Sequence, residues 1–307
     1  MKPNLANGPS LAPQSVAGGA LYRLAAFAER EGGGNPAGVW IGDTLPDDAT
    51  MQAIAADIGY SETAFIAPAT GSTRTVRYFS PLAEVPFCGH ATIASGVALV
   101  AHGRAGGDGN ALATAGDAGT FVLDTRAGPV SVAVTSRDGR PHAALTSVVP
   151  RHEPASPELV AAALELIGWR VDELDPALAP ARAYGGAWHL VLAAATPERL
   201  AVLDYDMAAL ADLLRREGLV TLQLVWRESG SRWQARNPFP VGGVYEDPAT
   251  GASAAAFGGY LRDAGLVTAP SSLTIVQGVA MGRPSVIEVD IPREGGIVVR
   301  GGALPIA

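Results

Sequence analysis

Two helix-length stretches without charge constrain this 307-residue chain more than any other feature. No charged residue lies between His90 and His102, and none lies between Gly251 and Leu261. A helix that is apolar or small on every face is buried on every face, since a surface helix keeps a polar stripe. Each stretch therefore predicts a central helix that strands of the same chain surround.

The two stretches also resemble each other. When residues 89–103 are aligned with residues 251–265 without a gap, five positions are identical, including Gly96 with Gly258 and Leu99 with Leu261. Each stretch follows a strand-like segment and a loop that contains an aromatic residue and a proline. We therefore predict an α+β fold of two similar halves, each with a curved sheet around one buried helix.

The expected division follows from this repeat. Residues 1–18 contain no apolar core of signal-peptide length and are predicted to form a flexible leader. Residues 19–135 form the expected N-terminal half, and residues 136–307 form the C-terminal half.

Composition excludes several classes of function. The formal net charge is -8, only 17% of the residues are charged, and basic residues form no run. This argues against nucleic acid and against an anionic membrane surface as partners. No strongly apolar run is long enough to cross a membrane. We expect a cytoplasmic globular protein.

The cysteine and histidine content predicts neither a metal nor a cofactor. Cys88 is the single cysteine, which excludes an intrachain disulfide and a zinc site built on cysteines. We interpret it as a small buried side chain. The histidines after position 90 show no metal-ligand spacing, and the glycine-rich residues 31–38 lack the ending of a phosphate-binding loop.

The first turns of the two buried helices predict a binding site. A helix has free N–H groups and partial positive charge at its start, so two such starts facing one cleft would bind an anion, most simply a carboxylate. Gly89 and Gly251 would let a ligand approach the backbone. Asp247 lies in the loop before Gly251, although an ordinary Asp-Pro turn explains that residue more simply.

Two further residues have a structural and a functional interpretation. Glu62 precedes an apolar strand, where an acid commonly caps the segment or faces water. His90 falls in the first turn of a buried helix, where a hydrogen-bonded structural histidine is common. Neither residue identifies a catalytic site without the other.

Four motifs together resemble one known family. They are GNPAGV (34–39), SETAFI (61–66), CGHATIAS (88–95) and EDPATG (246–251), in the order and at the spacing of the PhzF family of phenazine-biosynthesis isomerases. The resemblance runs from about Leu21 to the last strand. It implies a fold similar to that of diaminopimelate epimerase, with an active site between two pseudo-symmetric halves, and a homodimer. It also implies that the last strand, near residues 298–307, could return to the first half.

The resemblance also implies roles for individual residues. Glu62 corresponds to the family's general acid/base, and His90 and Asp247 correspond to residues that line its site. The amides that follow Gly89 and Gly251 would hold the carboxylate of the substrate.

Three further residues would contact the substrate. Asn35, in the first motif, is one of them. Ala252 stands where the family usually has a serine, and Ser253 follows it, so the hydroxyl contact is missing or displaced by one residue.

These residues predict an isomerase. With one cysteine the chain cannot use the two opposed thiols of racemases of this fold, whereas one carboxylate can move a proton between two carbons of a conjugated system. We expect a cofactor-independent isomerase of a small anionic amino or hydroxy carboxylic acid in specialised metabolism. The alternatives are a one-base epimerase or dehydratase, and a non-catalytic protein that binds small acids.

Overall fold

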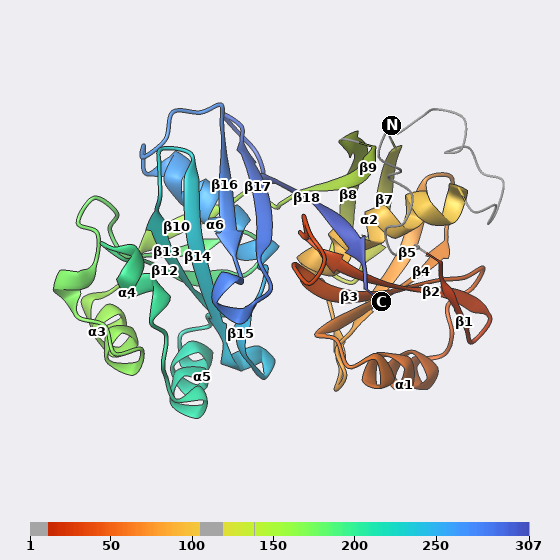
Figure 1. The fold of residues 1–307 in the computed structure, drawn as a ribbon, viewed down its shortest axis with the longest axis horizontal. Helices are drawn as coiled ribbons and strands as arrows, with labels where there is room; N and C mark the ends of the chain where they lie inside the picture. Colours follow the sequence, from red (N-terminus) through yellow and green to blue (C-terminus); the bar gives the residue numbers. More distant parts are fainter. Residues whose placement is uncertain (1–11, 105–118, 138, 307) are drawn as a thin grey trace, which may run out of the picture. The chain divides into compact units, whose positions relative to one another are not determined.

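The chain consists of two compact units, seen in a computed structural model that describes residues 12–104, 119–137 and 139–306. Unit 1 comprises the residues up to Leu145 together with those from Gly301 onward, and unit 2 comprises Thr146–Arg300. In Figure 1 the main part of unit 1 is coloured red to yellow-green, and unit 2 continues from green to blue.

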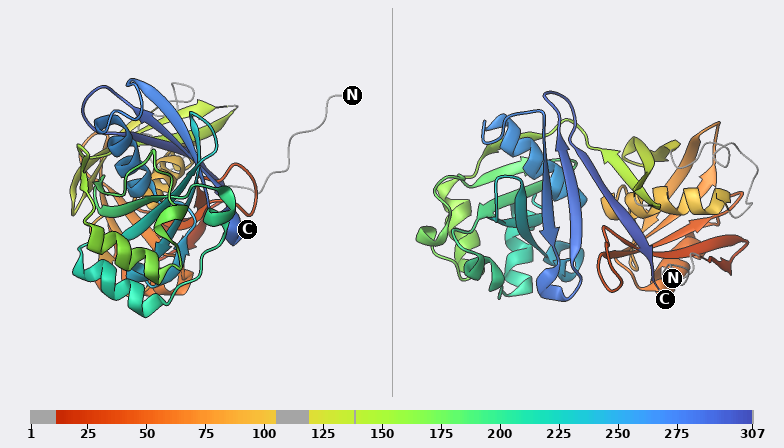
Figure 2. Two further views of the ribbon diagram at one scale, coloured as in Figure 1. Left: turned by 90° about the vertical axis from the view of Figure 1, so that its left-hand side faces the viewer. Right: turned by 45° about the horizontal axis from the view of Figure 1, so that its top comes forward.

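Unit 1 is a closed barrel of eight strands around a helix. Pairing proceeds from β2 to β3, β4, β5, β7, β8 and β9, and β18 closes the ring by pairing with both β9 and β2. Helix α2 contacts β2, β3, β4 and β8, and it lies among these strands in Figures 1 and 2. The strands are β2 (Gly19–Ala26), β3 (Asn35–Ile41), β4 (Glu62–Pro68), β5 (Thr73–Phe79), β7 (Gly119–Thr125), β8 (Gly128–Arg137), β9 (Arg140–Thr146) and β18 (Val298–Pro305), and the helix is α2 (Gly89–Arg104).

A second helix, α1 (Asp48–Ile58), covers the outside of this barrel. Its buried Met51 packs with Trp40 and Phe65, which project outward from β3 and β4. Strand residues alternate between faces, so Glu62 at the start of β4 projects to the opposite face, toward α2. The sequence of α1 sets its ends: Asp47 accepts a hydrogen bond from the Thr50 amide, and Gly59 adopts φ 67°.

Unit 2 repeats the arrangement around helix α6 (Gly251–Asp263). Helices α3, α4 and α5 cover the outside and contribute to one apolar cluster with β12 and β13. The remaining elements are β10 (Arg151–Pro154), β11 (Ala181–Tyr184), β12 (Trp188–Ala193), β13 (Thr221–Arg227), β14 (Arg232–Phe239), β16 (Ser271–Gln277), β17 (Ser285–Ile291), α3 (Pro157–Leu166), α4 (Pro197–Ala201) and α5 (Met207–Arg216), with 3₁₀ turns at Val171–Glu173, Pro240–Gly242 and Val279–Met281.

Strand pairing is the same in the two units. From β2 to β9 the pairs are antiparallel, parallel, antiparallel, parallel, antiparallel and antiparallel, and from β11 to β18 the same six follow in the same order. The short strands β6 (Glu84–Val85) and β15 (Val244–Asp247) pair with β5 and β14. The predicted α+β fold of two pseudo-symmetric halves, each around a central helix, is confirmed.

Two glycines show how closely the repeat holds. A Cβ atom on Gly96 of α2 would meet side chains of β8 and β9 at 2.9–3.2 Å, namely Val132, Ala143 and Val134. A Cβ atom on Gly258 of α6 would meet their register equivalents, Val289, Ile297 and Ile291, at 3.0–3.5 Å. Both helices therefore require glycine where they pack against the equivalent strands.

The structure bears on the predicted boundaries in three places. Residues 1–11 of the expected leader lie outside the described residues, but Gln14–Val16 form a strand, β1, that pairs with β2. The expected division at 135/136 lies inside β8. In β18, residues 298–300 pair with β17 of unit 2 and residues 303–305 pair with β2 of unit 1.

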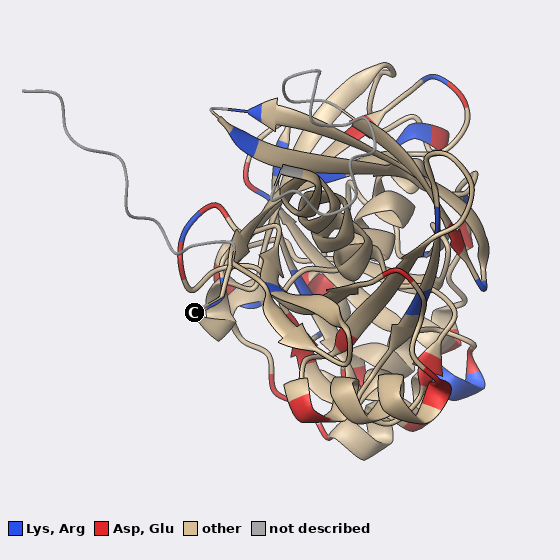
Figure 3. Ribbon diagram, turned by 90° about the vertical axis from the view of Figure 1, so that its right-hand side faces the viewer, with Lys and Arg blue, Asp and Glu red and all other residues tan. Residues whose placement is uncertain are grey.

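Two expectations about partners concern the surface. Among the described residues, no helix is both long and apolar enough to cross a membrane. Figure 3 marks the positions of Lys and Arg and those of Asp and Glu along the ribbon.

Candidate active site

Glu62 and His90 lie side by side in unit 1. Glu62 is the first residue of β4, and His90 is the second residue of α2. The Nε2 atom of His90 lies 3.4 Å from Oε2 of Glu62, and the two side chains are 7% and 15% exposed. The structure thus brings together two residues that the sequence separates by an entire hairpin, with His90 buried and Glu62 partly open to solvent.

The imidazole of His90 also contacts a thiol and a hydroxyl. Sγ of Cys88 lies 3.3 Å from Nδ1, and Oγ of Ser61 lies 3.3 Å from Nε2. A hydrogen bond within α2 holds its first turn: the Thr92 hydroxyl donates to the Cys88 carbonyl at 2.7 Å. Each nitrogen of this imidazole therefore has a partner that can give or take a proton.

A buried tyrosine supports the same turn. The hydroxyl of Tyr78 lies 2.7 Å from Oγ1 of Thr92, and both residues are fully buried. Burial raises the pKa of Tyr78, so this phenol is neutral and acts as a hydrogen-bonding support.

Asn35 and Gly89 occupy the same end of the barrel. Asn35 begins β3, two residues before Ala37, which pairs with Glu62, so all three project to the inner face. Asn35 is 1% exposed. Gly89 is the first residue of α2, where backbone N–H groups are free to bind an anion.

Asp247 is held by two residues of unit 2. It ends β15, and its Oδ2 accepts a hydrogen bond of 2.6 Å from the Thr250 hydroxyl. Gln277 donates to the Asp247 carbonyl at 2.7 Å and to Oγ1 of Thr250 at 3.0 Å. One buried amide therefore holds both Asp247 and Thr250 of the DPATG segment.

The first turn of α6 presents backbone donors. Thr250 is its N-cap residue, but the side chain makes no capping bond because its hydroxyl donates to Asp247. The amides of Gly251 and Ala252 consequently keep the polarity that favours an anion. Ala252 is partly exposed, and it brings no hydroxyl to the turn.

Ser253 lies in the interior of unit 2. It is fully buried, and its hydroxyl lies 3.0 Å from Oδ1 of Asn237 and also within hydrogen-bonding distance of Oε1 of Gln223. The hydroxyl of Ser253 is thus occupied by side chains of unit 2, and Ala252 brings none to the turn. The expected contact between the Ser253 hydroxyl and substrate stays a prediction.

The buried network around Ser253 continues to a histidine. Thr221 donates to Oδ1 of Asn237 at 3.0 Å, and Nδ1 of His189 lies 2.7 Å from the Thr221 hydroxyl. Because the Thr221 proton is already donated, Nδ1 of His189 carries the ring proton. Burial lowers the pKa of His189 to about 3, so this imidazole is neutral.

Sequence reasoning identified some of these residues and missed others. Glu62, His90 and Asp247 were singled out, whereas Ser61 and Gln277 were not. Ser61 was visible as the neighbour of Glu62 in the motif SET. Gln277 had no local signal, because it reaches Asp247 from a strand 30 residues later.

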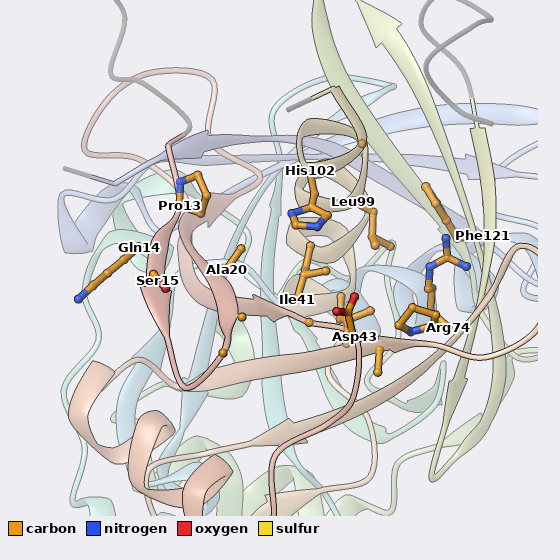
Figure 4. A pocket seen from close by; sticks show the side chains of 17 residues that line it. Pro13, Gln14, Ser15, Ala20, Ile41, Asp43, Arg74, Leu99, His102 and Phe121 are labelled. Carbon is orange, nitrogen blue, oxygen red and sulfur yellow. The ribbon is translucent and has the colours of Figure 1, made fainter. Parts of the chain in front are cut away.

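A cavity of about 410 Å³ in unit 1 lies away from these residues. Its lining includes Asp43, Arg74 and His102, which Figure 4 shows together with Leu99 of α2. His102 follows His90 by 12 positions on one helix, which is about 18 Å along the axis. This cavity is therefore separate from the pair of Glu62 and His90.

The chain is similar to known proteins over nearly its whole length. The sequence profile of the family described as "Phenazine biosynthesis-like protein" (PhzC-PhzF) matches residues 24–306. An uncharacterised isomerase of Mesorhizobium japonicum is 32% identical over 275 residues, which cover 86% of this chain and 87% of that protein. The trans-2,3-dihydro-3-hydroxyanthranilate isomerase of Pseudomonas fluorescens is 28% identical, and the match covers 85% of this chain and 86% of that enzyme.

The fold is similar to that of a solved structure. A PhzF-family phenazine biosynthesis protein of Bacillus anthracis superposes with a TM-score of 0.78 at 20% identity, and the match covers 94% of this chain and 96% of that chain. The resemblance predicted from four short motifs is thus confirmed by the family profile and by the fold. The chain belongs to the PhzC-PhzF family of phenazine biosynthesis-like proteins and is an enzyme of the isomerase class.

Proposed function

We propose that the protein moves a proton, and with it a double bond, within a small unsaturated carboxylic acid, and that Glu62 carries the proton. The observation that carries this proposal is the pair of Glu62 and His90 at the start of α2, with 3.4 Å between Oε2 and Nε2. The carboxyl is neither exposed nor locked in a salt bridge with Lys or Arg among the described residues. It is therefore available for proton transfer to a bound substrate.

The reaction is balanced by one carboxyl group. The Glu62 carboxylate removes a proton from one carbon, and the electron pair of that C–H bond enters the neighbouring π system. The Glu62 carboxylic acid then returns a proton to another carbon of the system, where a new C–H bond forms. Electrons and atoms are conserved, so the chain needs no oxidant or second substrate.

His90 is assigned the role of orienting the Glu62 carboxyl. Its Nε2 is held near Glu62 and Ser61, and its Nδ1 faces Cys88. A fixed imidazole can hydrogen-bond the carboxylate or a polar substituent of the substrate. Positioning of this kind keeps the carboxyl oriented through both proton transfers.

The starts of α2 and α6 suit an anionic substrate. Backbone donors follow Gly89 and Gly251, and they favour a carboxylate, which they would also stabilise as negative charge develops beside it. That Asn35, Asp247, Ala252 and these amides bind the same substrate as Glu62 stays a prediction. So do the homodimer and the cytoplasmic location.

The test uses proton NMR in deuterated buffer. Trans-2,3-dihydro-3-hydroxyanthranilate, the substrate in the name of the Pseudomonas enzyme, is compared with cyclic amino acids that carry a diene or an alkylidene group. More compounds of the second group are tested, because Ala252 lacks the hydroxyl that the family usually has at this turn. A double bond that migrates in any of them supports the proposal.

Two other outcomes would replace the proposal. Deuterium that enters a stereocentre without migration of a double bond would indicate a one-base epimerase. Compounds that bind, as measured by calorimetry, and are recovered unchanged would indicate a protein that binds small acids.

A further inference from the structure

Three side chains of different chemistry converge at the start of α2. The carboxylate of Glu62, the thiol of Cys88 and the imidazole of His90 place one ligand atom each within 4.8 Å of one another. Cys88 and His90 are buried, and Glu62 is partly buried. This is the one group of three or more such residues found in the described part of the chain.

The spacing of the Glu62 and His90 ligand atoms matches that around a tetrahedral zinc ion, and Cys88 lies near them. Zinc binds sulfur at about 2.3 Å, imidazole nitrogen at about 2.0–2.1 Å and carboxylate oxygen at about 2.0–2.2 Å, so neighbouring ligand atoms lie about 3.4–3.6 Å apart. Oε2 of Glu62 lies 3.4 Å from Nε2 of His90, and Sγ of Cys88 lies 3.9 Å from the same nitrogen. Sγ lies nearer to Nδ1, at 3.3 Å, so Cys88 must move toward Nε2 before the three atoms can surround one ion.

The backbone already holds two of the ligands. The carbonyl of Cys88 accepts bonds from the amide and the hydroxyl of Thr92, at 3.0 and 2.7 Å, which fixes the turn that carries Cys88 and His90. Less ordering is then required when a metal binds. A thiolate with an imidazole selects zinc over magnesium or calcium, which prefer oxygen ligands.

We propose that Glu62, Cys88 and His90 form a three-ligand site for Zn²⁺ that competes with proton transfer by Glu62. A carboxylate oxygen bound to zinc is no longer free to accept a proton from carbon, so the metal would act as a reversible inhibitor. The inhibitory part rests on the function proposed above, whereas the metal site does not. The sequence predicted no metal site, and a mixed set of ligands was not visible in it because Glu62 lies 26 positions before Cys88.

Cobalt(II) is the probe for the site, because it replaces zinc and absorbs light. The chain without an affinity tag is titrated with Co²⁺ and followed in the near ultraviolet, where a thiolate bound to cobalt gives a charge-transfer band. The chain contains a single cysteine, so such a band can come only from Cys88. We expect one equivalent of Co²⁺ to saturate the band and Zn²⁺ to displace it.

Variants of Cys88 and Glu62 test these two ligands. Cys88→Ser should abolish the band, and Glu62→Gln should keep it with affinity weakened by about tenfold or more. His152→Ala is the matched control, because this histidine lies on β10 in the other unit and should leave the titration unchanged. Circular dichroism and thermal melting establish that each variant is folded.

The two parts of the proposal can fail separately. A wild-type chain without a thiolate band, or a Glu62→Gln chain with unchanged affinity, overturns the metal site whether or not the chain turns over any substrate. If the band saturates, turnover should fall in parallel and a chelator should restore it. A saturated band with unchanged turnover would show that the metal binds but does not inhibit, so the metal site would stand and the inhibition would be rejected.

Discussion

Helices α2 and α6 begin at equivalent positions of two units that share one strand pattern, but the side chains at these positions differ. The strand registers align Cys88 with Thr250, His90 with Ala252 and Glu62 with Thr221. The start of α2 thus carries a carboxylate, a thiol and an imidazole, whereas the start of α6 carries hydroxyls and one acid, Asp247. The repeat preserves the scaffold and leaves the chemistry free to diverge.

One ion pair is preserved in both units. Arg77 donates two bonds to Glu84, each of 2.7 Å, and Arg236 donates two bonds to Glu246, of 3.0 and 2.6 Å. The registers make these pairs equivalent, since each links the last part of a long strand to the short strand beside it. Both hold the loop that enters a central helix, which explains why this contact is kept.

The largest expected effect distinguishes these two pairs. Arg236→Ala should lower the free energy of unfolding by about 3–5 kcal/mol, because Glu246 is 5% exposed and would remain buried without its partner. Arg77→Ala should cost less than half as much, since Glu84 keeps Arg126 at 2.6 Å. Urea denaturation measures both.

The surface pair of Arg232 and Glu228 provides the control for this comparison. Arg232→Ala should change the free energy of unfolding by at most about 0.5 kcal/mol, because both side chains are exposed. Equal losses for the Arg77 and Arg236 variants would contradict the distinction between the two units.

The second prediction concerns the buried network of unit 2. His189 has a pKa of about 3 when folded and 6.5 in its unperturbed state, so the unfolded chain binds more protons as pH falls from about 6.5 toward 3. This histidine should therefore destabilise the fold by about 2 kcal/mol between pH 7 and pH 5. Stability should be insensitive to His189 above pH 7.

A variant separates this effect from other acid-sensitive groups. His189→Asn keeps a donor for the Thr221 hydroxyl and removes the titration, so its loss of stability over the same pH range should be smaller by that amount. Thermal melting at several pH values checks it. Parallel pH profiles for the two chains would show that His189 is not responsible.

The third prediction tests the packing repeat. Gly96→Ala and Gly258→Ala should each lower the free energy of unfolding by about 1 kcal/mol, since overpacking outweighs the helix preference of alanine. Gly103, near the end of α2, has no described heavy atom within 4 Å of a built Cβ. Gly103→Ala should therefore stabilise the chain, by up to about 1 kcal/mol.

The smallest expected effect concerns the missing hydroxyl. Ala252→Ser places a hydroxyl on a partly exposed position of the first turn of α6, so it should change KM by less than about tenfold and leave the melting temperature unaltered. Ser253→Ala should lower the melting temperature and leave KM unchanged, because that hydroxyl contacts only buried groups among the described residues. Steady-state kinetics and melting curves, measured together, test this contrast.

Much of the fold was predictable because its signals are local. Residues 91–101 and 252–261 are uncharged on every face, and Asp47 and Gly59 mark the ends of α1, so central and outer helices could be told apart. The boundary between the units, after Leu145, was not predictable, because it depends on pairing between distant strands. The return of the last strand to the first half was expected from the family resemblance, but its pairing with β17 as well was not.

The candidate site was predictable to the extent that short motifs carry it. Glu62, His90 and Asp247 lie in such motifs, but the partners that hold them are distant in sequence. The hydroxyl of Ser253 points inward because Asn237 and Gln223 lie on β14 and β13, and this long-range arrangement is absent from the local pattern GAS.

The most direct test of the central claim is the turnover of Glu62→Gln on a substrate that the wild-type chain converts, with binding measured in parallel by calorimetry. Glu158→Gln, an exposed change in the first turn of α3, is the control. If Glu62 carries the proton, kcat should fall by about 10²- to 10⁴-fold while Kd stays within about threefold of the wild-type value. Turnover by Glu62→Gln within about tenfold of wild type would show that another group moves the proton and would contradict the account.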